Sequence, residues 1–180
     1  DFVLAFPQAD LDVPVYMGIP AGMELAGLGN QSSTHLLKLK KSLYGLKQAS
    51  FNWHNKLKAA LEERGFVESL SDPCAFISKK MVVLCYIYDC ILISKESPTI
   101  QEFIDSLTNG PENFVFTDEG PMSSYLGVDV SRLPDKKGFT LSQPFLIDRI
   151  IKALNFDPAT TKGARGNTPA AYPLLSKDED

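Results

Sequence analysis

The feature that most restricts the fold is a pair of apolar segments separated by only two residues. Met81–Ile87 and Cys90–Ser94 are rich in Val, Ile and Leu, and Tyr88-Asp89 stands between them. Apolar runs of this length with so short a connection predict a β-hairpin of two buried strands. Residues 81–93 are only 13 in number and contain Asp89, whereas a membrane-spanning helix needs about 20 apolar residues. We therefore predict a hairpin inside a globular fold, with no transmembrane helix and no membrane partner.

The predicted turn of this hairpin, Tyr88-Asp89, is unusual. Two-residue hairpin turns favour Asn-Gly or Gly-X, so an aromatic residue followed by a carboxylate conflicts with local preference. Such conflicts are expected at functional sites. A carboxylate at a rigid hairpin tip can bind a hard cation such as magnesium, which takes one or two carboxylates together with substrate phosphates. The alternative, a solvent-exposed turn aspartate with no such role, stays open.

The remaining pattern predicts helices and strands in irregular alternation. Apolar spacing predicts helices over residues 49–64 with Gly65 as the stop, from Ser97 as the cap with Pro98 first to before Gly110, and over about 143–155. Strands are predicted near residues 113–117, 124–132 and 138–141. This order indicates an α+β fold, an antiparallel sheet covered on one face by helices. No glycine-rich phosphate loop follows a predicted strand, which disfavours a doubly wound nucleotide fold.

Composition places the chain among ordinary globular proteins. It has 180 residues, 44% of them hydrophobic and 22% charged. Its three cysteines show no C-x-x-C spacing, so we expect free, packed thiols and a reducing compartment. Residues 21–34 read as a linker and residues 157–180 as a flexible tail. Because residue 1 is Asp, we expect a fragment of a longer protein, and no signal peptide is visible.

Charge is distributed unevenly along the chain. The net charge of −4 is unlike that of a free-standing nucleic-acid binder, which is usually strongly basic. No acidic residue occurs from Leu25 to Leu61, however, and this stretch carries Lys38, Lys40, Lys41, Lys47, Lys56 and Lys58. Tyr44, Phe51 and Trp53 lie among them. The stretch predicts either a phosphate-contacting face or a solvated face balanced by acids elsewhere in the fold.

An ordered series of motifs resembles one family across nearly the whole chain. The series is DFVLAF at residues 1–6 with QADL at 8–11 and VYM at 15–17, then LKKSLYGLKQA at 39–49 with Trp53, GF at 65–66 with SDPC at 71–74, YIYDCILI at 86–93, FTDEG at 116–120, YLGVDV at 125–130, LSQ at 141–143 and TP at 168–169. Together these resemble the reverse transcriptase of copia-type (pseudovirus) long-terminal-repeat retrotransposons.

The resemblance implies a right-hand polymerase architecture. Residues 1–123 would form the palm with partial fingers, including a fingers-like insertion over about 12–40. Residues 124–156 would form a primer-grip hairpin and the first thumb helix, before the tail at 157–180. It also implies an RNA-directed DNA polymerase within a retrotransposon polyprotein. The partners would be an RNA or DNA template with its primer, deoxynucleoside triphosphates, and integrase and RNase H domains outside this chain. The location would be intracellular, in the cytoplasm or a virus-like particle.

The resemblance further implies a two-metal site, with two Mg²⁺ ions that carboxylates hold roughly 4 Å apart. Asp1 would be the first metal ligand, and Asp89 would be the second aspartate of the family's Y-x-D-D motif. The substrate-binding residues would be Phe6, Gly45, Lys47 and Gln48. The nucleic-acid-binding residues would be Lys40, Lys41, Tyr125, Leu126 and Gly127.

The chain departs from the family motif at the centre of this site. Tyr88 stands where the family has the aspartate that bridges both metals, and a phenol is neutral at pH 7. Ser50-Phe51 replaces the family's Pro-Arg pair, which removes a cation. We expect activity to be lower by three or more orders of magnitude, or absent. A non-catalytic nucleic-acid-binding relic, and a decayed element without function, are the alternatives.

Overall fold

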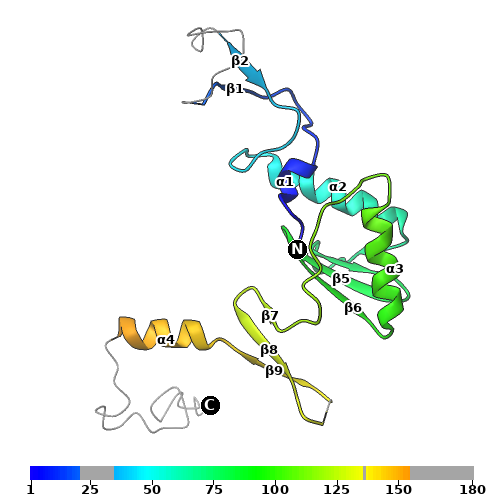
Figure 1. Ribbon diagram of the computed structural model, residues 1–180, viewed down its shortest axis with the longest axis vertical. Helices are drawn as coiled ribbons and strands as arrows, with labels where there is room; N and C mark the ends of the chain where they lie inside the picture. Colours follow the sequence, from blue (N-terminus) through cyan, green and yellow to red (C-terminus); the bar gives the residue numbers. More distant parts are fainter. Residues whose placement is uncertain (21–34, 136, 155–180) are drawn as a thin grey trace, which may run out of the picture. The chain divides into compact units, whose positions relative to one another are not determined.

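The computed structural model describes residues 1–20, 35–135 and 137–154 (Figure 1). The chain divides into two compact units, Asp1–Met122 and Ser123–Asp180. Helices and strands are mixed, and every strand pair is antiparallel, which confirms the predicted fold class at this level. The predicted linker at 21–34 and tail at 157–180 lie outside the described residues. None of the described helices has the length and apolar character needed to cross a membrane.

The first unit contains two sheets and three helices among its described residues. β1 (Tyr16–Gly18) pairs with β2 (Leu36–Lys38), both within the predicted fingers-like insertion. A four-stranded sheet has the order β3-β4-β5-β6. Its strands are β3 (Val67–Glu68), β4 (Ala75–Ile77), β5 (Met81–Tyr86) and β6 (Asp89–Ser94). The helices are α1 (Ala5–Gln8), α2 (Ala49–Glu63) and α3 (Ser97–Thr108).

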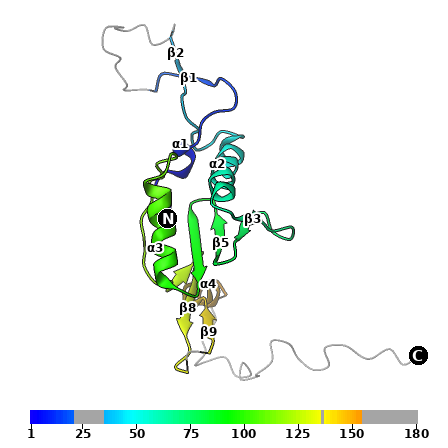
Figure 2. The same ribbon diagram turned by 90° about the vertical axis from the view of Figure 1, so that its right-hand side faces the viewer.

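The core lies between one face of the four-stranded sheet and the helices α2 and α3. Alternate residues of β5 point into it, as the period of two in a strand requires. The buried apolar residues of α2 recur at helical spacing, and Figure 2 shows α3 running along the same sheet. The core cluster includes Trp53, Leu57, Ala60 and Leu61 from α2, Phe76 from β4, Met81, Val83 and Cys85 from β5, and Phe103 and Leu107 from α3.

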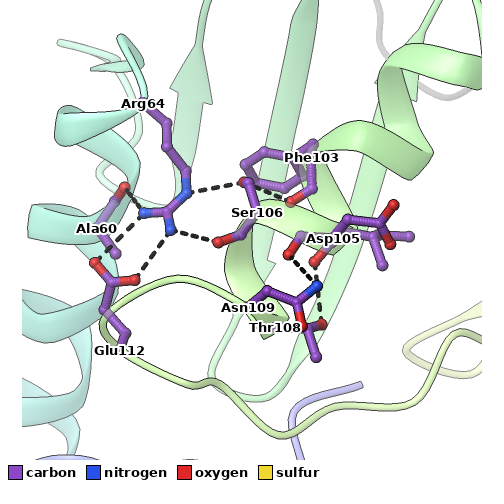
Figure 3. A network of polar contacts seen from close by, with 9 residues as sticks. Ala60, Arg64, Phe103, Asp105, Ser106, Thr108, Asn109 and Glu112 are labelled. Carbon is purple, nitrogen blue, oxygen red and sulfur yellow. Dashed lines mark hydrogen bonds and ion pairs between the residues drawn. The ribbon is translucent and has the colours of Figure 1, made fainter.

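The end of α2 is fixed by a glycine and an arginine. Gly65 has φ +78°, a left-handed conformation that glycine adopts without strain, so the predicted stop at Gly65 is confirmed. The guanidinium of Arg64 donates to the carbonyl oxygens of Ala60 and Ser106, both at 2.7 Å, and its Nη2 lies 3.0 Å from Oε2 of Glu112 (Figure 3). This network joins the last turns of α2 and α3 to the loop that follows α3.

Two local predictions about the central hairpin and α3 are wrong. The hairpin turn is Ile87-Tyr88, because Tyr86 pairs with Asp89, which is the first residue of β6. This register keeps Cys90 and Leu92 on the core side, whereas a shift of one residue would turn them outward. The residue that caps α3 is Glu96, and Ser97 already lies inside the helix.

Residues 113–117 form no regular strand, contrary to prediction. Phe116 makes only an isolated bridge with Phe2. The backbone N–H of Val115 donates to Oε1 of Gln8 at 3.0 Å, so a side chain takes a donor that a strand neighbour would need. The local pairing with the first residues of the chain therefore does not extend into a sheet.

Within residues 123–135 and 137–154, the second unit contains a three-stranded sheet, order β7-β8-β9, followed by one helix. Its elements are β7 (Ser124–Tyr125), β8 (Val128–Arg132), β9 (Phe139–Ser142) and α4 (Pro144–Ala153). The predicted strand at 124–132 is wrong, because Leu126 and Gly127 form a turn that divides it into β7 and β8. The predicted strand at 138–141 and the predicted helix are present, although the predicted helix end at Asn155 lies outside the described residues. No residue of α4 is buried.

A substitution at Gly110 tests how tightly the residues around Arg64 pack. A Cβ atom added at Gly110 would collide with the backbone carbonyl of Ser106 and with the Arg64 guanidinium. Gly110→Ala should lower the free energy of unfolding by about 1–3 kcal/mol, as overpacking does. Gly18→Ala is the matched control, because a Cβ at Gly18 meets nothing within 4 Å. Urea unfolding measures both variants, and equal stabilities would contradict this account.

The carboxylate of Glu112 should make stability depend on pH. The hydrogen bond from Arg64 holds the pKa of Glu112 below its ordinary value of 4.5. A lowered pKa contributes stability above about pH 4.5 that is lost as pH falls through the native value. Glu112→Gln should therefore cost about 1–3 kcal/mol at pH 7, and this difference from the wild type should shrink towards pH 3. Urea unfolding across that range checks it; a constant difference would be the contrary result.

Candidate active site

The tip of the β5-β6 hairpin is held by hydrogen bonds to two backbone carbonyls. The indole Nε1–H of Trp53, on α2, donates to the carbonyl oxygen of Ile87 at 2.6 Å. The backbone N–H of Phe2 donates to the carbonyl oxygen of Tyr88 at 2.8 Å. Ile87 has φ 58°, which an isoleucine rarely adopts. The surrounding structure therefore holds a strained turn in place.

The first residues of the chain lie between this tip and residues 115–117. The N–H of Val3 donates to the carbonyl of Val115 at 2.9 Å, and that of Thr117 donates to the carbonyl of Asp1 at 2.8 Å. The side chain of Gln8 adds a clamp, since its Nε2 donates to the carbonyls of Val3 and Val115 at 2.7 and 2.8 Å. Asp1 therefore belongs to a backbone segment that is bonded on both sides.

An aromatic cluster packs beneath the tip. The ring of Phe2 meets those of Trp53 and Phe114 edge to face, with centroids 4.9 and 5.3 Å apart, and Trp53 and Phe114 are 5.7 Å apart. All three rings are buried. Such edge-to-face pairs add about 0.5–1.5 kcal/mol each beyond area burial. The cluster therefore ties α2, the chain start and the loop after α3 to one another, and the hydrogen bonds of Trp53 and Phe2 connect them to the hairpin tip.

The two predicted metal ligands, Asp1 and Asp89, lie on adjacent backbone segments. Phe2 points into the core, and neighbouring side chains of an extended segment point to opposite faces, so Asp1 lies on the face away from α2 and α3. Asp89 pairs with Tyr86 beyond the core pair Cys85 and Cys90, which gives Asp89 the same outward face. Asp89 is half-buried.

Tyr88 occupies the second turn position with 42% of its surface exposed. Among the residues that the structure describes, no three His, Cys, Asp or Glu side chains gather as a metal-binding group. The tip therefore carries the Asp89 carboxylate and the Tyr88 phenol, and Asp1 lies on the backbone segment bonded to it.

The predicted substrate-binding residues lie around the start of α2. The ring of Phe6 packs against Tyr44, with centroids 4.6 Å apart, at the edge of the core. Gly45 has φ +93°, a conformation that would strain a residue with a side chain. The side chain of Lys47 is exposed, and Gln48 caps α2, where its carbonyl accepts the N–H of Asn52 at 2.9 Å.

The lysines of the lysine-rich stretch fall into two groups, those with a hydrogen-bonding or acidic partner and those that are exposed without an acidic partner. Lys41 pairs with Asp10 at 2.6 Å, Lys56 donates to the carbonyl of Gln8 at 2.7 Å, and Lys58 pairs with Glu68. Burial lowers the pKa of Lys56, whereas the bond to Glu68 raises that of Lys58. In the described parts of the chain, exposed lysines without an acidic partner remain within this stretch at Lys38, Lys40 and Lys47.

The predicted primer-grip residues lie in the second unit. Leu126 and Gly127 form the two-residue turn between β7 and β8, with φ values of 49° and 79°. Positive φ at both turn residues matches the right-handed twist of the flanking strands. Tyr125 pairs with Val128 at the base of this turn.

Sequence reasoning missed two residues that position the site. In the sequence, Trp53 stands out only as an aromatic residue of the lysine-rich stretch and as part of a family motif. A buried indole N–H needs an acceptor, and this requirement could have indicated its role. For Gln8, no sequence signal pointed to the clamp between Val3 and Val115.

Comparison with known proteins decides the family. The sequence profile of the reverse transcriptase (RNA-dependent DNA polymerase) family matches residues 1–167. The chain belongs to this family. The predicted resemblance to copia-type retrotransposon reverse transcriptases is thereby confirmed.

The relatives of this reverse transcriptase domain are polyproteins. It is 30% identical over 165 residues to the Retrovirus-related Pol polyprotein from transposon TNT 1-94 of Nicotiana tabacum, covering 88% of this chain and 12% of the relative. It is 32% identical over 163 residues to the Retrovirus-related Pol polyprotein from transposon RE1 of Arabidopsis thaliana, covering 87% of this chain and 11% of the relative. It is 27% identical over 185 residues to the Transposon Ty1-DR4 Gag-Pol polyprotein of Saccharomyces cerevisiae, covering 100% and 11%. The chain thus spans about 12% of the length of the first relative. No solved structure matches it.

Trp53→Phe should loosen the tip of this domain. The variant keeps an aromatic ring in the cluster but leaves the carbonyl of Ile87 without its donor. The free energy of unfolding should fall by about 1–3 kcal/mol. Phe51→Leu, a change at an exposed aromatic residue of the same helix, is the control and should be near neutral. Thermal and urea unfolding measure both, and equal values for the two variants would rule out a holding role for this bond.

Proposed function

We propose that this chain is the palm of a reverse transcriptase, with part of the fingers and the start of the thumb, whose active site is the tip of the β5-β6 hairpin. The observation that carries the proposal is the 2.8 Å hydrogen bond from the N–H of Phe2 to the carbonyl of Tyr88. It joins the backbone next to Asp1 to the backbone next to Asp89. Two residues 86 positions apart in sequence are thus bonded to each other, which supports a site built from the two neighbouring acids.

Asp1 and Asp89 would hold the divalent ion on which reverse transcriptases depend. The fit rests on the outward face that the two residues share and on oxygen ligands, which Mg²⁺ prefers. One or two carboxylates together with substrate phosphates make a usual Mg²⁺ site. When bound, metal ions in such sites activate the attacking hydroxyl and stabilise the leaving group's charge.

The chain's own residues would position the nucleotide and the template with its primer. Lys47 is exposed near the start of α2, where its charge would attract the triphosphate. Phe6, packed against Tyr44, would lie beneath the sugar, and Gly45 and Gln48 would contact the nucleotide through backbone and side chain. Lys40 and Lys41 would face the template, although Lys41 would first have to leave Asp10. Tyr125, Leu126 and Gly127 would contact the primer.

We propose that this site is catalytically weak. Tyr88 takes the place of a metal-bridging carboxylate, so two acids remain where the family motif has three. A neutral phenol offers no comparable charge to a metal ion. Each 1.4 kcal/mol of lost transition-state stabilisation lowers the rate about tenfold. A loss of several kcal/mol corresponds to three or more orders of magnitude.

Tyr88→Asp should restore activity. In a chain extended at both ends to the whole reverse transcriptase region, this variant should raise Mg²⁺-dependent primer extension by a thousandfold or more. Tyr88→Phe is the matched control and should remain at the wild-type level, since it changes the ring without adding charge. Asp89→Asn in the Tyr88→Asp background should abolish the gain. A folded Tyr88→Asp protein that extends no primer would refute this account.

A non-catalytic nucleic-acid-binding role is the second candidate. It is favoured by Lys38, Lys40 and Lys47, which are exposed and have no acidic partner among the described residues. Binding through lysines to phosphates releases counterions and weakens as salt rises. Such binding needs no metal ligand, so it would survive the loss of the aspartate at position 88.

Charge reversal separates specific phosphate contacts from a general charge effect. Lys40→Glu with Lys47→Glu should weaken binding to a template–primer duplex and reduce the salt slope of log K by about two. Lys79→Glu with Lys80→Glu is the matched control, because these exposed lysines lie in the β4-β5 turn and the charge change is equal. Fluorescence anisotropy across a salt series measures both. Equal affinities for the two double variants would contradict a nucleic-acid-binding role of Lys40 and Lys47.

The wider context follows from the relatives. Their names are Pol polyproteins of transposons, and we propose that this chain is likewise one domain of a polyprotein that includes RNase H and integrase domains. Its substrates would be deoxynucleoside triphosphates and an RNA or DNA template with its primer. The site of action would be inside the cell that carries the element, in its cytoplasm or in a particle.

A further inference from the structure

The β5-β6 hairpin brings two cysteines face to face one step below its turn. Cys85 pairs with Cys90 in the strand register, and their Sγ atoms lie 3.1 Å apart. Both side chains point to the core side of the sheet. These thiols belong neither to the proposed metal site nor to the exposed lysines Lys38, Lys40 and Lys47.

The backbone pattern around this pair suits a covalent bond between the strands. The N–H of Cys85 donates to the carbonyl of Cys74 at 2.9 Å, which points it away from β6. Cys85 and Cys90 therefore form a non-hydrogen-bonded pair, in which Cα atoms of opposite residues are typically about 4.5 Å apart. Disulfides span Cα separations of roughly 4.4 to 6.8 Å, so the bridge fits without moving the strands far.

The two sulfurs differ in access. Cys85 is 7% exposed, whereas Cys90 is half-buried and is the sulfur that a small solute reaches first. We propose that Cys85 and Cys90 form a redox-active dithiol, which hydrogen peroxide closes into a disulfide within the hairpin. Cys74, an exposed residue directly before β4, serves as an internal comparison.

The chemistry balances with peroxide as the oxidant. The sulfur of Cys90 attacks one peroxide oxygen, so an S–O bond forms, the O–O bond breaks and one water leaves, giving a sulfenic acid. The sulfur of Cys85 then attacks the sulfenic sulfur, so the S–S bond forms, the S–O bond breaks and the second water leaves. Two thiols are oxidised by two electrons in total, and one peroxide is reduced to two waters.

The bond would enclose the four residues Tyr86–Asp89 in a covalent ring. It would lie on the core side of the hairpin, opposite the face of Asp89. The inference rests on the register and the sulfur contact alone, so it stands whether or not the tip binds a metal ion or extends a primer.

Peptide mapping tests the proposal directly in the wild-type chain. The reduced protein is treated with hydrogen peroxide, remaining thiols are alkylated, and the chain is cut with trypsin. One tryptic peptide, Met81–Lys95, holds Cys85 and Cys90, and another, Gly65–Lys79, holds Cys74. The expected result is a Met81–Lys95 peptide lighter by two hydrogens and not alkylated, while Cys74 in the other peptide remains alkylated.

Two variants sharpen the test. Cys74→Ser should leave this mass change intact, and Cys90→Ser should abolish it and leave Cys85 alkylated. The proposal is overturned if both thiols of Met81–Lys95 remain alkylated at peroxide doses that oxidise Cys74. It is overturned equally if oxidation links Met81–Lys95 to Gly65–Lys79 or joins two chains. The wild-type map decides the matter even if Cys90→Ser fails to fold.

Discussion

The arrangement of the first unit depends on how the carbonyls of the β5-β6 turn are satisfied. Ile87 and Tyr88 lie at the tip of an apolar hairpin, and their carbonyl oxygens accept hydrogen bonds from the Trp53 indole and the Phe2 backbone. A partly buried carbonyl without a donor would cost about 1–3 kcal/mol. These two bonds bring α2 and the start of the chain to the tip, and the proposed metal site rests on them.

Polar contacts and apolar packing act at opposite ends of the same helix. Near its start, α2 presents Trp53 to the hairpin tip, and at its end Arg64 bonds to Ser106 of α3 and to Glu112 of the following loop. Apolar residues of α2 between these points cover one face of the sheet. A helix held at both ends gives the tip a rigid support, which the proposed metal site would need.

The elements that the sequence predicts correctly have strong apolar periodicity. The wrong predictions fall where a contact with a distant segment determines the local structure. The helix α2, the two strands of the central hairpin and the stop at Gly65 followed from spacing and from glycine's freedom at positive φ. The turn was misplaced by one residue, because the register depends on which residues of β6 face the core built with α2 and α3. The strand at 113–117 failed because a side chain, Gln8, took the N–H of Val115.

By itself the sequence determined the family and the candidate ligands, since ordered motifs are a property of the chain and need no coordinates. It also determined the loss of one acid at Tyr88. Only the tertiary structure decided which residues meet: Asp1 beside the hairpin tip, Lys41 against Asp10, and Cys85 opposite Cys90. The physical reason is that hydrogen-bond partners and strand register depend on contacts between distant segments, which local preferences along the chain do not encode.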